Sequence, residues 1–235
     1  LILAGLGCLY GGLHFRAGVW DALMDIGGSG LLALPFLERS ARVRLLAAAG
    51  YLAVYQTIYS YTGYGDWVIS RSMNGGPLGP LSWVFMLLLG TLAGDLMLHG
   101  DRRRILWHGL GWALLLSVLG WAFRAEWPGL KLFWPFSPYM MSVPYPLYAT
   151  GLAFALLIAF YLLCDVAGWR FPHLSLLGRN PLVLYLLQAL LVVLVRVIFS
   201  SETGVLGALL AFTGVYTVCY LTAWGMHRRG IIVKI

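Results

Sequence analysis

Residues 80 to 98 read PLSWVFMLLLGTLAGDLML, with Asp95 as the one charged residue among them. The centre of the run, Trp83 to Leu89, is apolar at every position, whereas a membrane-spanning β-strand alternates apolar and polar residues over about ten positions. A helix needs about 20 predominantly apolar residues to cross the hydrocarbon core of a bilayer. The run therefore predicts a membrane-spanning α-helix.

The composition of the whole chain points to the same class of protein. Of the 235 residues, 60% are hydrophobic and 11% are charged, whereas soluble domains carry about 25% charged residues. So few charges cannot cover a water-facing surface of this size. We therefore interpret the formal net charge of +7 as a sign of membrane topology, and we expect no nucleic-acid partner.

Similar runs recur along the chain and predict an all-α, polytopic transmembrane bundle of about eight spans in a single membrane domain, residues 1–235. The chain opens inside an apolar run without an initiator Met, so we expect it to be the carboxyl-terminal portion of a longer protein. The expected spans are Leu1 to Leu13 (incomplete), Val19 to Leu37, Val43 to Tyr59, Pro80 to Leu98, Ile105 to Phe123, Pro146 to Val166, Pro181 to Phe199 and Val205 to Met226.

The basic residues predict the orientation of the bundle, because cytoplasmic loops carry an excess of Lys and Arg. Four residues fall on one side of the expected spans: Arg16, Arg71, Arg124 and Lys131. Eleven fall on the other: Arg39, Arg42, Arg44, Arg102, Arg103, Arg104, Arg170, Arg179, Arg228, Arg229 and Lys234. This split places the carboxyl terminus in the cytoplasm and predicts an integral membrane protein in contact with the lipid bilayer.

Charged residues inside expected spans are costly and mark candidate sites. Asp21 and Asp25 are four residues apart and would share one helix face. Asp25 and Arg196 could form an ion pair, or all three could form a proton or ion relay in a transporter or flippase. For such a relay, the Gly27-Gly28-Ser29-Gly30 segment would interrupt the second span.

Other polar and small residues have structural interpretations. We expect Asp95 and Asp165 to form ion pairs with nearby Arg clusters, and His108 to lie at the membrane interface. Gly90 and Gly94 fit a small-xxx-small helix contact, internal or between subunits. The five His and three Cys show no metal-ligand spacing, so we expect no metal.

Aromatic residues fill the two long outer loops, Ser60 to Gly79 and Arg124 to Tyr145. They suit the lipid headgroup zone and also suit stacking against sugar rings. Both interpretations stay open at this point.

Several landmarks, taken in order, resemble the heparan-alpha-glucosaminide N-acetyltransferase family and its bacterial relatives, which are polytopic membrane acyltransferases. They lie between residues 79 and 235. They are Gly79-Pro80-Leu81-Ser82-Trp83 leading to Leu89-Gly90-Thr91-Leu92-Ala93-Gly94, the segment Ser137 to Gly151, Cys164-Asp165-Val166-Ala167-Gly168-Trp169, Gly178-Arg179-Asn180-Pro181-Leu182 with Tyr185, and His227 to Ile235.

The resemblance implies transfer of an acetyl or other acyl group from cytoplasmic acyl-coenzyme A, as co-substrate, to an amino or hydroxyl group of an envelope saccharide. The implied location is a bacterial inner membrane. The implied catalytic His belongs to a region that precedes this chain. Arg102, Arg103, Arg104 and His108 are the candidate residues for acyl-coenzyme A. Candidates for the cavity and the saccharide acceptor are Asn180, Arg179, Tyr185, Ser142, Tyr145, Lys131, Asp25 and Arg196.

Three departures limit what the resemblance implies. Met24-Asp25 stands where the family has Gln-Arg, Ser137-Pro138 stands where it has Asn-Lys, and the catalytic His of the family is not part of this chain. The charge reversal at Asp25 and the missing amino-terminal region keep another hypothesis open: the chain could be a non-catalytic membrane subunit that keeps the fold, either as a homodimer or in a larger membrane complex.

Overall fold

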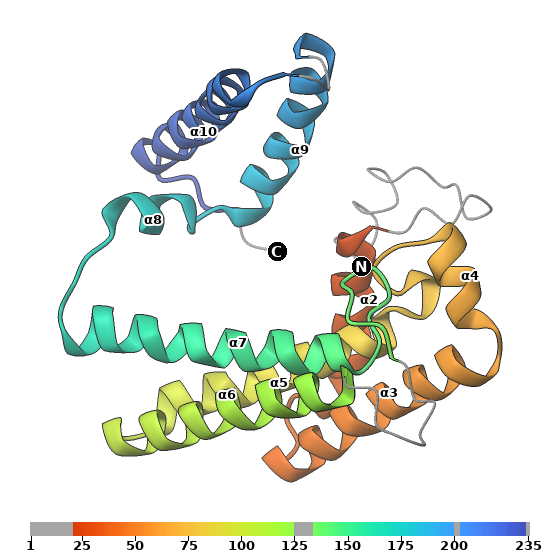
Figure 1. Cartoon of the computed structure of the whole chain (residues 1–235). Helices are drawn as coiled ribbons and strands as arrows, with labels where there is room; N and C mark the ends of the chain where they lie inside the picture. The colour runs from red at the N-terminus through yellow and green to blue at the C-terminus, as the bar shows by residue number, and fades with distance from the viewer. Residues whose placement is uncertain (1–20, 125–133, 200–202, 234–235) are drawn as a thin grey trace. The chain divides into compact units, whose positions relative to one another are not determined.

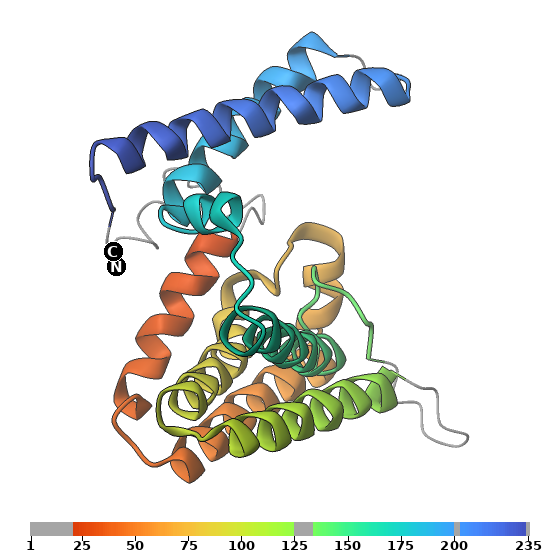
Figure 2. The ribbon, with the colours of Figure 1, turned by 90° about the vertical axis from the view of Figure 1, so that its left-hand side faces the viewer.

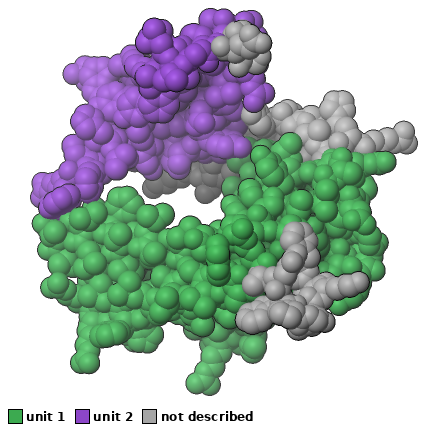
Figure 3. Space-filling view, in the orientation of Figure 1, with its two compact units in different colours: residues 1–167 green, residues 168–235 purple. Residues whose placement is uncertain are grey.

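The computed structural model describes residues 21–124, 134–199 and 203–233, and these residues form nine α-helices with short 3₁₀ and π segments. The chain divides into two compact units, residues 1–167 and 168–235 (Figure 3). The helices of the first unit are α2 (Ala22–Ala33), α3 (Ala41–Tyr61), α4 (Tyr64–Arg71), α5 (Pro80–His99), α6 (Arg102–Arg124) and α7 (Pro144–Phe160) (Figure 1). Those of the second unit are α8 (Pro172–Leu177), α9 (Pro181–Ile198) and α10 (Val205–Arg228).

Within the described residues, five helical segments are long and apolar enough to cross a membrane, as in an integral membrane protein. They match five of the expected spans and comprise Gly76–His99, Arg102–Arg124, Pro144–Val166, Pro181–Ile198 and Val205–Arg228. The first expected span, Leu1 to Leu13, lies outside the described residues. The second and third are helical but do not meet the same standard of length and hydropathy.

The physical reason differs between these two helices. The second span forms α2 and continues only as a short 3₁₀ turn, η2 (Leu34–Phe36), which contains Pro35. The third forms α3, which has 21 residues but buries the polar side chains of Arg44 and Gln56 inside the first unit. A helix covered by other helices can carry polar groups because the protein, and not lipid, contacts them.

The core of the first unit lies where α5 packs against α2, α3 and α7, and α6 packs along α7 (Figures 1 and 2). Leu88 and Leu89 of α5 are almost completely buried in it. Close approach between α6 and α7 depends on glycine, since a Cβ at Gly120 would meet the Tyr148 amide nitrogen at 2.6 Å and the Pro144 carbonyl oxygen at 2.7 Å. A Cβ at Gly151 would likewise collide with Ser117.

Gly90 and Gly94, expected at a helix contact, do not make one within the described part of the chain. A Cβ at either position would meet no atom within 4 Å. The described first unit therefore has no such contact, and a contact with other residues or between subunits stays a prediction.

Up-and-down connectivity gives the first unit two chemically different ends. The basic end is where α3 begins, α5 ends and α6 begins. The aromatic end is where α3 ends and α5 begins, and it contains α4 and residues 134–143. Gly75 N–H donates to the Tyr139 carbonyl at 2.9 Å, so the two long loops, which the sequence placed on the same side, meet at the aromatic end.

The second unit has almost no buried surface of its own. None of the residues of α9 is buried, and Ala223 is the one buried residue of α10. Large side chains such as Val197 and Leu206 are more than two-thirds exposed. Apolar helices of this kind require an apolar environment outside the unit, and a lipid bilayer provides one.

Candidate functional site

A cavity of about 540 Å³ opens at the basic end of the first unit. Arg42 of α3, His99 at the end of α5, and Arg104 and His108 of α6 line it, together with Asp95 and apolar residues that include Trp112 and Phe154. A short connection brings these residues together, because α5 ends at His99, Gly100 is its C-cap, and α6 begins at Arg102. The cavity therefore combines two guanidinium groups and two imidazoles with an apolar wall.

Of the four residues predicted to contact acyl-coenzyme A, the structure brings two into this cavity. Arg104 and His108 line it, whereas Arg102 and Arg103 are exposed at the start of α6 and do not. Arg42 and His99 were missed, because the sequence assigned Arg42 only to topology and gave His99 no role. Their position at helix ends on the side predicted to be basic was the signal that could have found them.

His108 is oriented by its own helix. Its Nδ1 lies 3.1 Å from the Arg104 carbonyl oxygen. If Nδ1 donates a proton to that carbonyl, Nε2 keeps a lone pair and can accept a hydrogen bond or a proton. His108 is exposed beside the Arg cluster, and its place at the membrane interface stays a prediction.

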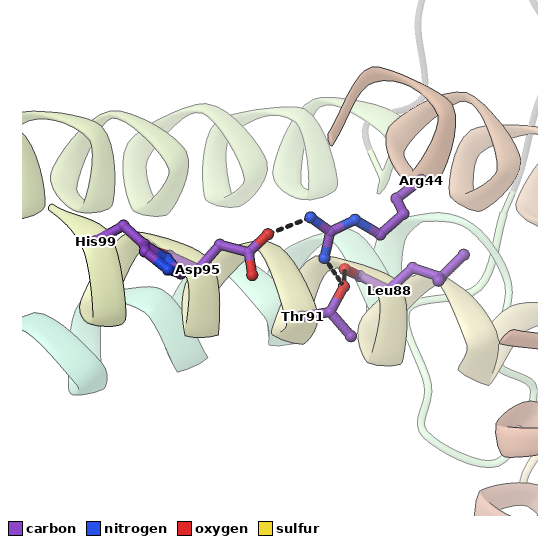
Figure 4. A network of polar contacts seen from close by, with 5 residues as sticks. All are labelled: Arg44, Leu88, Thr91, Asp95 and His99. Atoms are coloured by element: carbon purple, nitrogen blue, oxygen red, sulfur yellow. Dashed lines mark hydrogen bonds and ion pairs between the residues drawn. The ribbon is translucent and has the colours of Figure 1, made fainter. Parts of the chain in front are cut away.

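Beside the cavity, α3 and α5 are joined by a polar network (Figure 4). Arg44 is 6% exposed, forms an ion pair with Asp95, and donates from Nη1 to Thr91 Oγ1 at 2.8 Å. Thr91 in turn donates to the Leu88 carbonyl at 2.6 Å. The expected ion pair of Asp95 with an Arg cluster is confirmed, and it joins two helices.

Asp165 behaves differently from Asp95. It lies in η4 (Tyr161–Val166), a π-helical segment after α7, and makes no ion pair with the residues that the structure describes. The prediction of an ion pair for Asp165 is therefore wrong in the described chain.

The two Asp residues of the second expected span have different roles. Asp21 precedes α2 as its N-cap, and its carboxylate accepts from the Leu23 N–H at 3.1 Å. Asp25 lies within α2 and is completely buried, next to Gly79, where a Cβ would approach Asp25 Oδ1 to 2.6 Å. Asp25 N–H also donates to the Asp21 carbonyl at 3.3 Å, and a functional pairing of the two carboxylates stays a prediction.

The same region argues against a broken helix. Helix α2 runs without interruption through Gly27 to Gly30, so the expected break is absent. Arg196, the third member of the predicted relay, lies on α9 in the second unit; its pairing with Asp25 stays a prediction.

At the aromatic end, buried polar side chains join the two long loops. Tyr55 donates to the Met140 carbonyl at 2.6 Å, and Ser82 donates to the Met141 carbonyl at 2.6 Å. Gln56 Oε1 accepts from the Val143 N–H at 2.9 Å. The sequence gave these three residues no role, because each contact spans more than 50 residues of chain.

Tyr64 fixes the other side of this junction. Its hydroxyl donates to the Gly75 carbonyl at 2.7 Å and accepts from the Leu78 N–H at 3.0 Å. Burial raises the pKa of the Tyr64 hydroxyl to about 12, so it keeps the proton that it donates. Gly75 itself has φ +87, a left-handed conformation that favours glycine.

The predicted acceptor residues of this end have structural partners. Ser142 is completely buried and donates to the Pro135 carbonyl at 2.5 Å. Tyr145 packs edge-on against Phe136, with ring centroids 5.9 Å apart. Lys131 lies outside the described residues.

In the second unit, Asn180 binds the end of the chain. Its Nδ2 donates to the Ile231 carbonyl at 3.1 Å, and its Oδ1 accepts from the Val233 N–H at 2.8 Å. Pro181 begins α9 as predicted, but the Asn180 side chain does not cap that helix. Nearby, Arg179 Nη1 contacts His227 Nδ1 at 2.5 Å, while Tyr185 is partly exposed on α9.

These contacts join two of the sequence landmarks, the Gly-Arg-Asn-Pro segment and the basic, Ile-containing terminus. Comparison of the chain with protein-family models, with curated proteins and with solved structures gives no significant match. Among the residues that the structure describes, no three His, Cys, Asp or Glu side chains gather as metal ligands do.

Proposed function

We propose that this protein is an integral membrane acyltransferase that transfers an acetyl or related acyl group from cytoplasmic acyl-coenzyme A to an envelope saccharide on the outer side. The observation that carries the proposal is the basic cavity with Arg42, Arg104, His99 and His108. The order of the sequence landmarks supports the same activity.

The charge of the cavity suits a phosphorylated donor. Guanidinium groups bind phosphate through charge-assisted, often bidentate hydrogen bonds. The volume of about 540 Å³ lies within the range of about 300–1,000 Å³ that is usual for small-molecule sites. The apolar wall formed by Trp112 and Phe154 would contact the uncharged part of such a donor.

The position of the cavity agrees with the proposed direction of transfer. Residues from three helix ends that the sequence assigned to the cytoplasmic side all line it. In the proposed topology of about eight spans, with a cytoplasmic carboxyl terminus, the aromatic end then faces outward and the acceptor approaches there.

The proposed donor site is tested by calorimetric titration of the purified protein with acetyl-coenzyme A. We expect Arg42→Gln and Arg104→Gln each to weaken binding roughly tenfold, because a hydrogen bond to a charged group contributes about 1.5–3 kcal/mol. Arg103→Gln is the matched control, since Arg103 is exposed outside the cavity. Equal losses in all three variants, or no binding by the unchanged protein, would contradict the donor site.

Transfer itself is tested in membranes that contain radiolabelled acetyl-coenzyme A and an aminosugar acceptor. Label in the sugar supports the enzyme. Binding of acetyl-coenzyme A without transfer to the sugar would instead support the alternative, a non-catalytic membrane subunit of a larger complex or of a homodimer.

A further inference from the structure

The basic cavity is elongated, and its inner part differs chemically from its mouth. On α6, Arg104, His108 and Trp112 line it, and because they follow one another at intervals of four they share one face of the helix. An α-helix rises about 1.5 Å per residue, so Trp112 lies about 12 Å further from the basic end than Arg104 does. The cavity therefore extends from the start of α6 well into its length.

The lining of α5 and α3 changes in the same direction. On α5, His99 lines the mouth and Leu92 lies about two turns further in, with Asp95 between them. On α3, Arg42 at the start of the helix is followed one turn later by Leu45. Charged groups and imidazoles thus gather at the helix ends, whereas apolar side chains line the inner part.

Two aromatic rings line the inner end. Trp112 stacks against Phe154 of α7, with ring centroids 6.4 Å apart, and Phe154 is buried. A polar group that reached these rings would lose its hydrogen bonds to water and gain few in return. The inner part of the cavity therefore suits an apolar group such as a hydrocarbon chain.

Two guanidinium groups at the mouth are available to an anion. Arg42 and Arg104 are exposed, and neither forms an ion pair with the residues that the structure describes. Asp95 also lines the cavity, but its carboxylate is paired with Arg44 (Figure 4). Since guanidinium groups bind phosphate through charge-assisted hydrogen bonds, the mouth suits a phosphate group.

The length and position of the cavity match those of a membrane lipid. Both α5 and α6 belong to segments that are long and apolar enough to cross a membrane, which would place the inner part at hydrocarbon depth. Half of a hydrocarbon core of about 30 Å is about 15 Å, close to the distance of about 12 Å between the levels of Arg104 and Trp112. Basic pockets between membrane helices are also known to bind anionic headgroups.

We propose that the basic cavity binds an anionic phospholipid, with its phosphate on Arg42 and Arg104 and one acyl chain along Leu92 and Trp112. The phosphate matches the mouth, and the chain matches the inner part. This lipid site does not rest on acyl transfer. It shares Arg42 and Arg104 with the proposed donor site, so the lipid and acyl-coenzyme A exclude one another.

Native mass spectrometry of the full chain, released from detergent, measures binding of the first lipid molecule. The delipidated protein is mixed with dioleoyl-phosphatidylglycerol or with dioleoyl-phosphatidylcholine, which has the same chains but a choline cation that offsets its phosphate. We expect phosphatidylglycerol to bind at least fivefold more tightly. Equal binding of the two lipids would overturn the proposal.

Substitutions at the mouth test whether the phosphate binds there. Arg42→Gln and Arg104→Gln should each weaken phosphatidylglycerol binding at least threefold, because each removes one of the two guanidinium groups. Arg103→Gln is the matched control, since Arg103 is exposed in the first turn of α6 but does not line the cavity. An equal loss in Arg103→Gln would mean that any positive charge at this end is sufficient, which contradicts a defined site.

Substitutions in the inner part test the position of the chain. Leu92→Trp fills this part and should weaken phosphatidylglycerol binding at least threefold, whereas Leu114→Trp, at an exposed position of α6 outside the cavity, should not. Unchanged binding in Leu92→Trp would overturn the chain position.

A spectroscopic measurement tests the chain position without Leu92→Trp, in case that variant does not fold. Equimolar phosphatidylglycerol with brominated chains should quench a larger fraction of the Trp fluorescence in the unchanged protein than in Trp112→Phe, because quenching by bromine requires close contact. Equal fractions would contradict contact between the chain and Trp112.

The lipid site and the donor site can fail separately. Phosphatidylglycerol binding that depends on Arg42 and Arg104, without any binding of acetyl-coenzyme A, would support the lipid site and contradict the donor site. The reverse result would contradict the lipid site alone. In a protein that binds both, an excess of acetyl-coenzyme A should displace the lipid, and simultaneous binding would overturn the shared use of the two Arg residues.

Discussion

Single polar residues inside the helices are mostly explained by partners in the protein. Arg44, Gln56 and Asn180 are each buried, and each binds groups at least 47 residues away in sequence. Their side chains hold helices or loops together at positions where lipid could not solvate them. Tyr59 is the exception that stands out, because its buried hydroxyl has no such partner among the described residues.

The ion pair of Arg44 with Asp95 predicts an asymmetry between two variants. The Arg44 side chain is 7% exposed and that of Asp95 is 52% exposed. Asp95→Ala should destabilise by about 1–2 kcal/mol, because it leaves a buried cation uncompensated. Arg44→Met should cost less, since it leaves only a half-exposed carboxylate and replaces the charge by an apolar chain.

Thermal unfolding in detergent checks this asymmetry. The double variant should be less destabilised than the sum of the two single ones. Arg39→Met, at an exposed position, is the control. A larger cost for Arg44→Met than for Asp95→Ala would show that the buried guanidinium is not the dominant charge.

At the scale of elements, glycine determines where helices touch. The seam between α6 and α7 contains Gly120 and Gly151, at which a Cβ would collide with the opposite helix. Gly111 lies on the same helix as Gly120 but has open space around it. Position along the helix, and not the number of glycines, decides which of them permits close packing.

Gly120 and Gly111, which both lie in α6, are expected to respond in opposite ways to substitution by Ala. Gly120→Ala should destabilise by about 1–3 kcal/mol, because its methyl group meets backbone atoms of α7 that cannot move aside alone. Gly111→Ala should be neutral or stabilising by up to about 1 kcal/mol, since Ala favours helix more than Gly does. Melting temperatures of the two variants measure the difference. Similar values would contradict close packing of α6 against α7 at Gly120.

The whole first unit has a basic end and an aromatic end, with a cavity at each. The basic cavity is lined by two Arg and two His, whereas the aromatic one carries Asp66 as its charged group. A bundle with such different ends can bind different molecules on the two sides of a membrane.

The two ends also predict the result of labelling from one side of the membrane. In a variant without native Cys, cysteine placed at Asp101 should react with an impermeant maleimide only from the cytoplasm. Cysteine placed at Tyr139 should react only from outside, because helices of α5 length separate the two positions. Labelling of both from the same side would overturn the proposed crossing of the membrane.

Much of the fold could be predicted from sequence, because a long apolar run is a local property of the chain and predicts a helix by itself. The runs that became α5, α6, α7, α9 and α10 are apolar over their length, and Pro80 and Pro181 begin helices where the pattern placed them. Basic residues likewise predicted that helix ends around Arg42 and Arg104 would lie together, and one cavity contains both. The pattern placed Asp21 inside a span, whereas it is the N-cap of α2, because an apolar run does not show at which residue the helix begins.

The sequence by itself determined the long helices, their apolar character and which of their ends are basic, because these properties depend on the order of neighbouring residues. Only the tertiary structure decided that Arg42 and His99 join Arg104 in a cavity, that Asn180 binds residues 231 and 233, and that the buried Tyr59 hydroxyl has no partner among the described residues. Each of these facts involves groups far apart in sequence or the space between them. Packing, and not local pattern, brings such groups together or leaves one of them unpaired.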